Sequence, residues 1–336
     1  MTELSESDWV LLADMGGTHA RFAYLKPDAP VPQLIGVYTA DTCPTFDDVM
    51  DQLCTSIEQH KLPLGRLARI CLAVAANPSA DEIVLTNNAW RFHRIELSQT
   101  LGCADIRVVN DFAAVARSLP LLEPKDTVQI GAGEAQAGGV MVAIGPGTGT
   151  GVASLVLDGV GEPLVVPGEG GHVDFAPVGD IEIAVLQYLR GQFERVSIER
   201  LLSGGGLLGL YRALCDIHGH GIALSTPEAI GKAAQAHSDT MAVEAMAVFF
   251  AVLGSVAGDL ALTLGARGGV YIAGGIVPRY VELLRHSQFR SRFESKGRFA
   301  EHNAGIPSFV VTHPNPGLLG VACLSSNTEP CTKTSV

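Results

Sequence analysis

The sequence predicts an α/β fold with two domains, and three observations support the prediction. Short apolar runs rich in β-branched residues alternate with longer stretches of helical periodicity, as in sheets covered by helices. A strand, a turn of glycine and threonine, and a returning strand occur twice, around residues 14–18 and 145–151, which suggests a duplicated architecture. At 336 residues, the chain is long enough for two hydrophobic cores.

The first domain is predicted to begin with strands over residues 9–13 and 20–24, joined by a glycine hairpin. Its other elements follow in chain order: a helix over 45–60 with an aspartate-rich start, a buried strand over 70–75, a polar loop at 86–90, a short helix over 95–101 and a strand that ends at Val109.

The end of that last strand carries the first candidate functional residues. Its β-branched run predicts a parallel strand covered on both faces, and the run stops at Asn110 and Asp111. Ligands of open α/β sheets bind outside the carboxyl ends of strands, where a carboxylate can accept a proton from a substrate hydroxyl. The alternative is that both residues cap a helix that starts near Phe112.

The second domain is predicted to follow a crossover at residues 120–125. Its expected strands cover 140–144, 152–157, 164–166, 270–273 and 308–311. Its expected helices cover 181–190, 199–215 with an interruption by the glycines at 203–206, a segment that begins at Thr226, and the long apolar stretch 241–264. A last helix of the chain is expected from Pro316. Residues 290–299 are charged and expected to be solvated, and the tail after Ser325 is expected to be disordered.

Composition excludes several classes of protein. The net charge of −12 argues against a nucleic-acid partner, because phosphate binding needs a basic face. The seven cysteines show no metal-binding spacing and are expected to be free thiols in a reducing cytoplasm. Residues 1–10 do not resemble a signal peptide. The apolar segment 245–258 is shorter than the roughly 20 residues that span a bilayer, so we expect a core helix and no membrane partner.

Two glycine-rich turns are candidate phosphate sites. Asp14 is followed by Gly16, Gly17 and Thr18, and a second turn holds Gly147, Thr148 and Gly149. Glycines let backbone N–H groups approach phosphate oxygens, and Asp14 could hold Mg²⁺ directly or through water. No Gly-Lys-Ser/Thr follows, so neither turn is a P-loop. Ordinary hairpin turns are the alternative.

Glu169, His172 and Glu199 are candidate ligands for a polyol. Glu169 and His172 lie in a glycine-rich stretch, and planar side chains of these types can bind sugar hydroxyls. A turn with a satisfied histidine, and a helix-capping role for Glu199, are the alternatives.

Taken together, these motifs resemble the bacterial hexokinase-like glucokinases of the actin-like sugar kinase and heat-shock ATPase superfamily. The similarity extends from residue 11 to about 322. It is carried by residues 14–21, 86–90, 109–113, 145–151, 167–177, 196–204, 268–278, 296–299 and 315–320. The resemblance implies two ribonuclease H-like domains flanking a deep cleft, a small one of residues 1–121 plus 313–336 and a large one of 122–312.

The resemblance also implies roles for individual residues. Asp111 matches the catalytic base, and the sugar ligands match Asn110, Asp111, Glu169, His172 and Glu199. The ATP phosphates would lie against the two turns, with Mg²⁺ carried by ATP near Asp14. The residues that would line the nucleotide site are Ala13, Asp14, Met15, Gly16, Gly17, Thr18, Gly147, Thr148, Gly149, Gly274 and Gly275. Ala13 departs from the glycine of many relatives. The cysteines that bind zinc in a related kinase family are missing after His172, so no zinc is expected.

The expected activity is therefore ATP-dependent phosphorylation of the 6-hydroxyl of glucose in the cytoplasm, by a chain that could form a homodimer. A kinase for another hexose or amino sugar, a catalytically silent sugar-binding regulator and a nucleotide phosphohydrolase are the alternatives. The presence of Asp14 and Asp111 argues against a catalytically silent regulator. A phosphohydrolase would leave the candidate sugar ligands Glu169, His172 and Glu199 unexplained.

Overall fold

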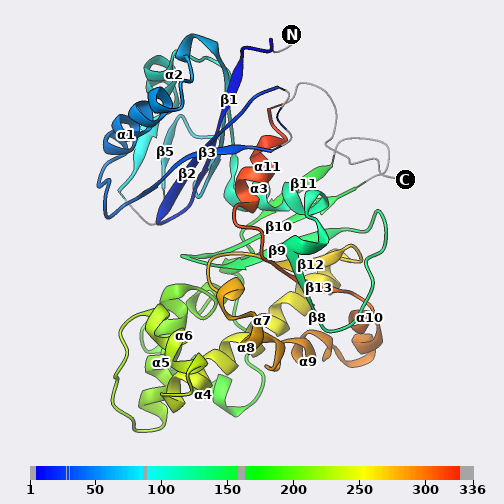
Figure 1. Cartoon of the computed structure of the whole chain (residues 1–336). Helices are drawn as coiled ribbons and strands as arrows, with labels where there is room; N and C mark the ends of the chain where they lie inside the picture. The colour runs from blue at the N-terminus through cyan, green and yellow to red at the C-terminus, as the bar shows by residue number, and fades with distance from the viewer. Residues whose placement is uncertain (1–4, 28, 30, 86–88, 158–162, 326–336) are drawn as a thin grey trace. The chain divides into compact units, whose positions relative to one another are not determined.

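The structure is a computed structural model that describes residues 5–27, 29, 31–85, 89–157 and 163–325 (Figure 1). Part of the predicted polar loop, residues 86–88, and the tail from 326 lie outside the described residues. The chain divides into two compact units. Unit 1 comprises residues 1–122, 158–167 and 313–336, and unit 2 comprises 123–157 and 168–312.

Unit 1 is built on a five-stranded mixed sheet of order β3-β2-β1-β4-β7. The hairpin of β1 and β2 is antiparallel, as is the β2–β3 pair, whereas β4 lies parallel to β1 and β7 parallel to β4. The strands are β1 (Trp9–Met15), β2 (His19–Leu25), β3 (Gln33–Thr39), β4 (Leu67–Val74) and β7 (Ile106–Asn110), with β5 (Glu82–Val84) and β6 (Arg91–His93) forming a separate small hairpin.

Helices cover both faces of this sheet (Figure 1). Side chains of a strand alternate between faces, and β1 shows it clearly. Trp9 and Leu11 pack into the core with α1 (Phe46–Gln59) and α2 (Arg94–Leu101). Val10 and Leu12 join the other core, which contains residues of α3 (Asp111–Ser118) and α11 (Pro316–Ala322). The same alternation directs Asp14 to the α3 and α11 face.

Unit 2 is built on a six-stranded mixed sheet of order β11-β10-β9-β12-β13-β8, although most of the edge strand β11 is grouped with unit 1. Its strands are β8 (Thr127–Ile130), β9 (Met141–Pro146), β10 (Thr150–Val156), β11 (Leu164–Gly168), β12 (Gly269–Ile272) and β13 (Ser308–Val311). β9 and β10 form an antiparallel hairpin, and β12 and β13 continue in parallel. The first five strands thus repeat the order found in unit 1, as the duplicated sequence pattern predicts.

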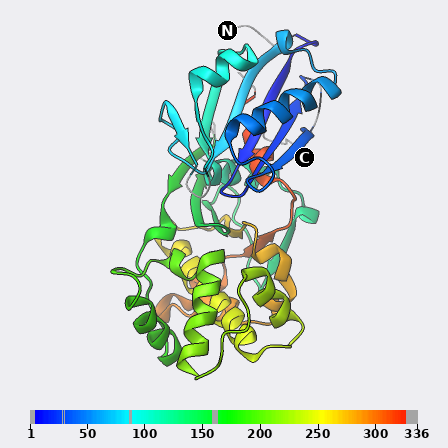
Figure 2. The ribbon, with the colours of Figure 1, turned by 90° about the vertical axis from the view of Figure 1, so that its left-hand side faces the viewer.

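The helices of unit 2 gather around one long apolar helix, α7, which contributes more buried residues to the local core than any other helix (Figure 2). Its 25 residues are long and apolar enough to cross a membrane, but 72% of its most apolar window is buried inside the protein, as expected of a core helix. The helices are α4 (Asp180–Arg190), α5 (Gly204–Ile217), α6 (Pro227–Gln235), α7 (Thr240–Leu264), α8 (Val281–Arg285), α9 (Phe289–Glu294) and α10 (Ala300–Ala304).

Two predictions about helices are wrong. The glycines at 203–206 do not interrupt a helix, because Ser203 caps α5 by accepting a hydrogen bond from Gly206 N at 2.9 Å. Residues 290–299 are not a solvated face. The side chain of Arg292 is only 14% exposed and pairs with Glu182 at 2.6 Å, and Phe293 is fully buried. The charges of Arg290 and Arg292 are therefore paired within the fold, whereas residues 297–299 are exposed as expected.

The strand ending at Val109 is less buried than predicted, although Val108 packs against the core on one face of the sheet and Val109 against the core on the other. β7 runs parallel to β4, as expected, but it is an edge strand and all five of its residues are only partly buried. Its β-branched run reflects strand propensity rather than full burial.

Candidate active site

Asn110 and Asp111 lie where β7 passes into α3 in unit 1. Asn110 caps the helix, and its Oδ1 accepts hydrogen bonds from Phe112 N at 2.9 Å and from Ala113 N at 3.1 Å. Asp111 is the first helical residue, and its Oδ1 also accepts from Phe112 N at 2.9 Å. The capping interpretation is thus correct for Asn110. Because its oxygen is engaged, the group that Asn110 can offer to a ligand is the Nδ2 amide.

Asp14 lies on the same face of the sheet as α3 and α11. In the β1–β2 hairpin it pairs in register with Arg21. Burial raises the pKa of the Asp14 carboxyl, and the positive charge of Arg21 opposes that rise. Gly317 in α11 allows the close approach, because a Cβ there would lie 2.6 Å from Asp14 Oδ2. A nearby cation would favour the charged form of this carboxylate.

The residues of unit 1 fit a magnesium ion that is carried by a nucleotide. Within the described part of the chain, no group of three or more His, Cys, Asp or Glu side chains could hold a metal by itself. Mg²⁺ is commonly bound through one or two carboxylates together with substrate phosphates. Asp14 could supply one such carboxylate.

The turn between β9 and β10 in unit 2 gathers the predicted phosphate-binding glycines. Gly147 N donates to Gly149 O, and Gly204 N donates to Gly147 O, each at 2.8 Å. Gly274 has a φ of +85°, and a Cβ there would lie 2.4 Å from Pro146 O. The backbone at Gly274 and Gly275 therefore lies directly against this turn, and only glycine fits at the first of the two positions.

Glu199 contacts this turn from a short 3₁₀ segment, Ile198–Arg200. Its Oε2 accepts a hydrogen bond from Thr150 N at 2.9 Å. The hydroxyl of Thr150 donates to Leu202 O at 2.6 Å, which ties the same two segments together a second time. Since Ser203 caps the following helix, the capping interpretation of Glu199 is wrong.

The segment that carries Glu169 and His172 packs on β10 beside Thr150. A Cβ at Gly171 would lie 2.3 Å from Thr150 O, and one at Gly170 would lie 2.8 Å from a Val152 methyl group. These glycines allow the segment to lie flat on the strand while the side chains of Glu169 and His172 remain exposed.

Arg195 holds the far end of this segment. Its Nη2 donates to His172 O at 2.6 Å, and its Nε donates to Asp174 Oδ1 at 2.5 Å. Arg195, Thr150 and Gly317 were missed as candidates by the sequence reasoning. Thr150 and Gly317 lie within motifs that carry the family resemblance, whereas nothing in the local sequence marks Arg195.

Each unit thus brings together part of the predicted set. Unit 1 places Asp14 on the sheet face covered by α3, the helix that begins at Asp111. Unit 2 gathers Glu199 and the segment with Glu169 and His172 around Thr150, beside the turn Gly147 to Gly149.

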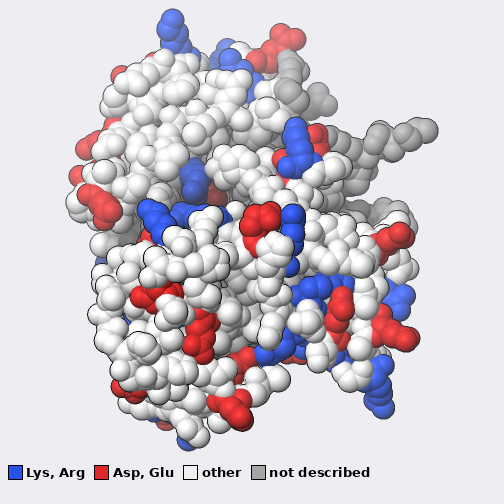
Figure 3. All heavy atoms as spheres, turned by 60° about the horizontal axis from the view of Figure 1, so that its bottom comes forward, with Lys and Arg blue, Asp and Glu red and all other residues white. Residues whose placement is uncertain are grey.

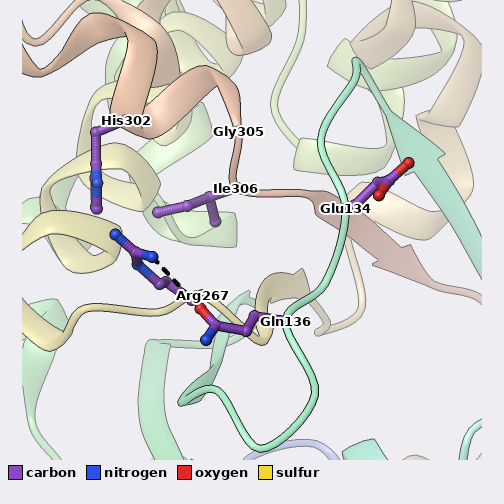
Figure 4. Close-up of a pocket in the computed structure, with 6 residues that line it drawn as sticks. All are labelled: Glu134, Gln136, Arg267, His302, Gly305 and Ile306. Atoms are coloured by element: carbon purple, nitrogen blue, oxygen red, sulfur yellow. Dashed lines mark hydrogen bonds between the residues drawn. The ribbon is translucent and has the colours of Figure 1, made fainter.

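Two pockets among the described residues have other linings. One of about 330 Å³ lies along α1 and is lined by Asp51, Gln52, Thr55 and Ser56. The other, of about 270 Å³, is lined by Glu134, Gln136, Arg267, His302, Gly305 and Ile306 (Figure 4). There Arg267 reaches toward His302 and donates to Gln136 Oε1 at 3.5 Å. None of the predicted site residues lines either pocket.

Charge on the surface is mixed. On the face drawn in Figure 3, Lys and Arg side chains lie among Asp and Glu side chains rather than in one continuous basic field. The expectation that nucleic acid is not a partner stays a prediction.

Comparisons with known proteins agree with the family resemblance. The sequence model of the glucokinase family matches residues 11–328. A curated glucokinase of Paramagnetospirillum magneticum is 43% identical over 321 residues, which are 95% of this chain and 98% of the relative. The crystal structure of a glucokinase from an Antarctic psychrotroph has a TM-score of 0.77 at 34% identity and covers 94% of this chain and 98% of its own.

A more distant structure shares the fold. A Balamuthia mandrillaris glucokinase in complex with glucose has a TM-score of 0.75 at 22% identity, covering 94% of this chain and 92% of its own.

Proposed function

The chain belongs to the glucokinase family, and on that premise we propose how its residues carry out the ATP-dependent phosphorylation of glucose. The observation that carries the proposal is the arrangement in unit 2. Glu199 and the segment with Glu169 and His172 meet at Thr150, immediately beside the turn Gly147 to Gly149. Candidate sugar ligands and a candidate phosphate-binding turn are therefore neighbours.

Asp111 acts as the general base. The 6-hydroxyl of glucose donates its proton to the Asp111 carboxylate while O6 forms a bond to the γ-phosphorus of ATP. The bond from that phosphorus to the bridging oxygen breaks, and ADP and glucose 6-phosphate are the products. Phosphoryl transfer depends mainly on positioning and charge stabilisation. The place of Asp111 at the carboxyl end of β7 supports this role.

The two glycine turns bind the nucleotide phosphates. In unit 2, backbone N–H groups around Thr148 and Gly149 face the phosphates, and Gly274 and Gly275 border the nucleotide. In unit 1, Ala13 to Thr18 forms the second turn. Mg²⁺ bound there would offset the negative charge of the phosphates, and Asp14 would hold it directly or through water.

Glucose is held by Asn110 and Asp111 of unit 1 and by Glu169, His172 and Glu199 of unit 2. Carboxylates accept from sugar hydroxyls, and the Nδ2 of Asn110 donates to one. Sugar that binds both sets of residues favours a closed state, which excludes water as a competing acceptor.

The fold assignment is part of this proposal. The units correspond to two ribonuclease H-like domains, of residues 1–121 plus 313–336 and 122–312, flanking a deep cleft. The repeated strand order supports the assignment, as does the grouping of residues 313–336 with the first unit. We place the enzyme in the cytoplasm, without nucleic-acid or membrane partners, and propose that it can form a homodimer.

The proposal is tested by coupled ADP release across a panel of hexoses and amino sugars. Glucose is expected to have the highest kcat/KM. Asp111→Ala is expected to lower turnover of glucose by about 10²–10⁴-fold, the usual effect of losing a positioned proton acceptor. Asp47→Ala is a matched control, because Asp47 also lies in the first turn of a helix but outside the site.

Two results would contradict the proposal. A tenth or more of wild-type turnover in Asp111→Ala would remove Asp111 as the base. A higher kcat/KM for another sugar would assign the enzyme to that sugar instead.

A further inference from the structure

Glu199, a proposed sugar ligand, is hydrogen-bonded to the end of the turn that is proposed to bind phosphate. One carboxylate oxygen, Oε2, is committed to Thr150 N at 2.9 Å. Its backbone carbonyl accepts from Ser203 Oγ at 2.8 Å, which holds the segment below the side chain. The other carboxylate oxygen, Oε1, is therefore the one that can bind a ligand. Because the turn holds Oε2, the position of the turn also fixes the direction of Oε1.

Gly149 is the residue that makes this contact possible. A Cβ at Gly149 would lie 2.6 Å from Glu199 Oε2 and 3.5 Å from its Cδ, and beyond the neighbouring residues of the chain no other atom would lie within 4 Å. At Gly147, two residues earlier in the same turn, a Cβ would meet its nearest atoms at 3.9 Å, an ordinary contact distance. The two glycines of one turn are therefore sterically different, and the difference is the Glu199 carboxylate.

We propose that Gly149 is a positioning residue for sugar binding, acting through Glu199 before any nucleotide is present. The inference rests on the proposed sugar role of Glu199. It adds that the turn assigned to phosphate also sets glucose affinity. A methyl group at position 149 pushes the carboxylate away from Thr150 N, and the hydrogen bond that orients it is lost. The pre-organisation that lowers the entropic cost of binding is lost with it.

The experiment is calorimetric titration of the full chain with glucose in the absence of nucleotide. Glu199→Ala and Gly149→Ala are each expected to raise the glucose Kd by about 10- to 100-fold, the range for losing a hydrogen bond to a charged group. Gly147→Ala is the matched control, and its glucose Kd is expected to stay within about twofold of wild type, whatever happens to its KM for ATP.

A double variant separates positioning from a general effect on the fold. In the Glu199→Ala background the methyl group at position 149 has nothing to displace, so Gly149→Ala is expected to change the glucose Kd no further. If Gly149→Ala alone is too unstable to titrate, the double variant is expected to have the higher unfolding temperature. The Glu199 carboxylate that the new methyl group would clash with is absent from the double variant.

The outcomes distinguish this inference from the proposed function. If Gly149→Ala binds glucose like the wild type while Glu199→Ala does not, the inference is wrong and the sugar role of Glu199 stands. Full additivity in the double variant, or a double variant no more stable than Gly149→Ala, also overturns the inference. If Glu199→Ala itself binds glucose normally, both the inference and the proposed role of Glu199 fail.

Discussion

The hairpins β1–β2 and β9–β10 occupy equivalent places in the two sheets but differ in chemistry. Each lies next to a parallel strand in the same strand order. The last paired residues are Met15 and Ala20 in the first hairpin, and Pro146 and Thr150 in the second, so the second turn is shorter. One residue before the last pair stands Asp14 in unit 1 and Gly145 in unit 2.

The first hairpin therefore carries a carboxylate, Asp14, next to its turn, and the second hairpin does not. Asp14 is half-buried against Gly317 and has a raised pKa. The second hairpin obtains a carboxylate from elsewhere, because Glu199 binds the backbone of Thr150. One duplicated scaffold thus carries a carboxylate of its own in one copy and receives one from a distant segment in the other, without any change of strand order.

The largest expected difference between the hairpins is the effect of removing the charge of unit 1. Asp14→Asn keeps the shape of the side chain, and we expect it to lower kcat by about 100-fold or more and to weaken the dependence on Mg²⁺. Glucose affinity is expected to be nearly unchanged. Steady-state kinetics over a range of Mg²⁺ concentrations, together with glucose titration, measure both. Lost glucose binding with normal use of ATP would reverse the roles of the two sites.

The same variant is expected to be more stable than the wild type at neutral pH. Burial raises the pKa of Asp14 in the folded state, so ionising this group at higher pH costs folding free energy. The stability that the protonated form contributes is complete below the unfolded pKa and is lost as pH rises through the folded value. The advantage of Asp14→Asn in thermal unfolding should therefore shrink as pH is lowered. A less stable variant at pH 7 would contradict burial as the dominant cause.

A smaller effect is expected when the Asp14 carboxylate is displaced rather than removed. In Gly317→Ala the new Cβ would lie within 3 Å of all three carboxyl atoms of Asp14. We expect kcat to fall about tenfold with little change in glucose Kd, since a misplacement of about 1 Å can cost about 100-fold. Gly65→Ala in the same unit is the control, because a Cβ there meets nothing within 4 Å. Equal kcat values for the two variants would show that the side chain at position 317 does not control the position of the Asp14 carboxylate.

Sequence reasoning succeeded where the signal is local. Glycines between two apolar runs predicted both hairpins, and the polar stop after Val109 located the strand end with Asn110 and Asp111. Thr226 before Pro227 likewise marked the start of α6.

It failed where the partner is distant in the chain. Arg292 looked solvated because its partner, Glu182, lies 110 residues away. The contact of Glu199 with Thr150 spans 49 residues, and no periodicity reports it. The edge position of β7 was also hidden, because β-branched residues suit edge and central strands alike.

The smallest expected effect concerns how unit 2 holds the segment with Glu169 and His172, and it sharpens the contrast with Asp14, which lies within the hairpin of unit 1 itself. Arg195 binds His172 O and Asp174, but the side chains of Arg195 and Asp174 are 57% and 76% exposed, and exposed ion pairs contribute little. We expect Arg195→Ala to raise the KM for glucose about threefold, because the segment that carries His172 loses one restraint. The kcat value and the KM for ATP should stay close to wild type.

Arg195→Lys should recover only part of the effect, since an ammonium group lacks the planar fork of donors that binds both acceptors. Arg190→Ala is the control, as Arg190 is an exposed arginine at the end of α4. If the two alanine variants have the same KM for glucose, Arg195 does not position His172, and the packing of Gly171 on Thr150 is sufficient to hold the segment.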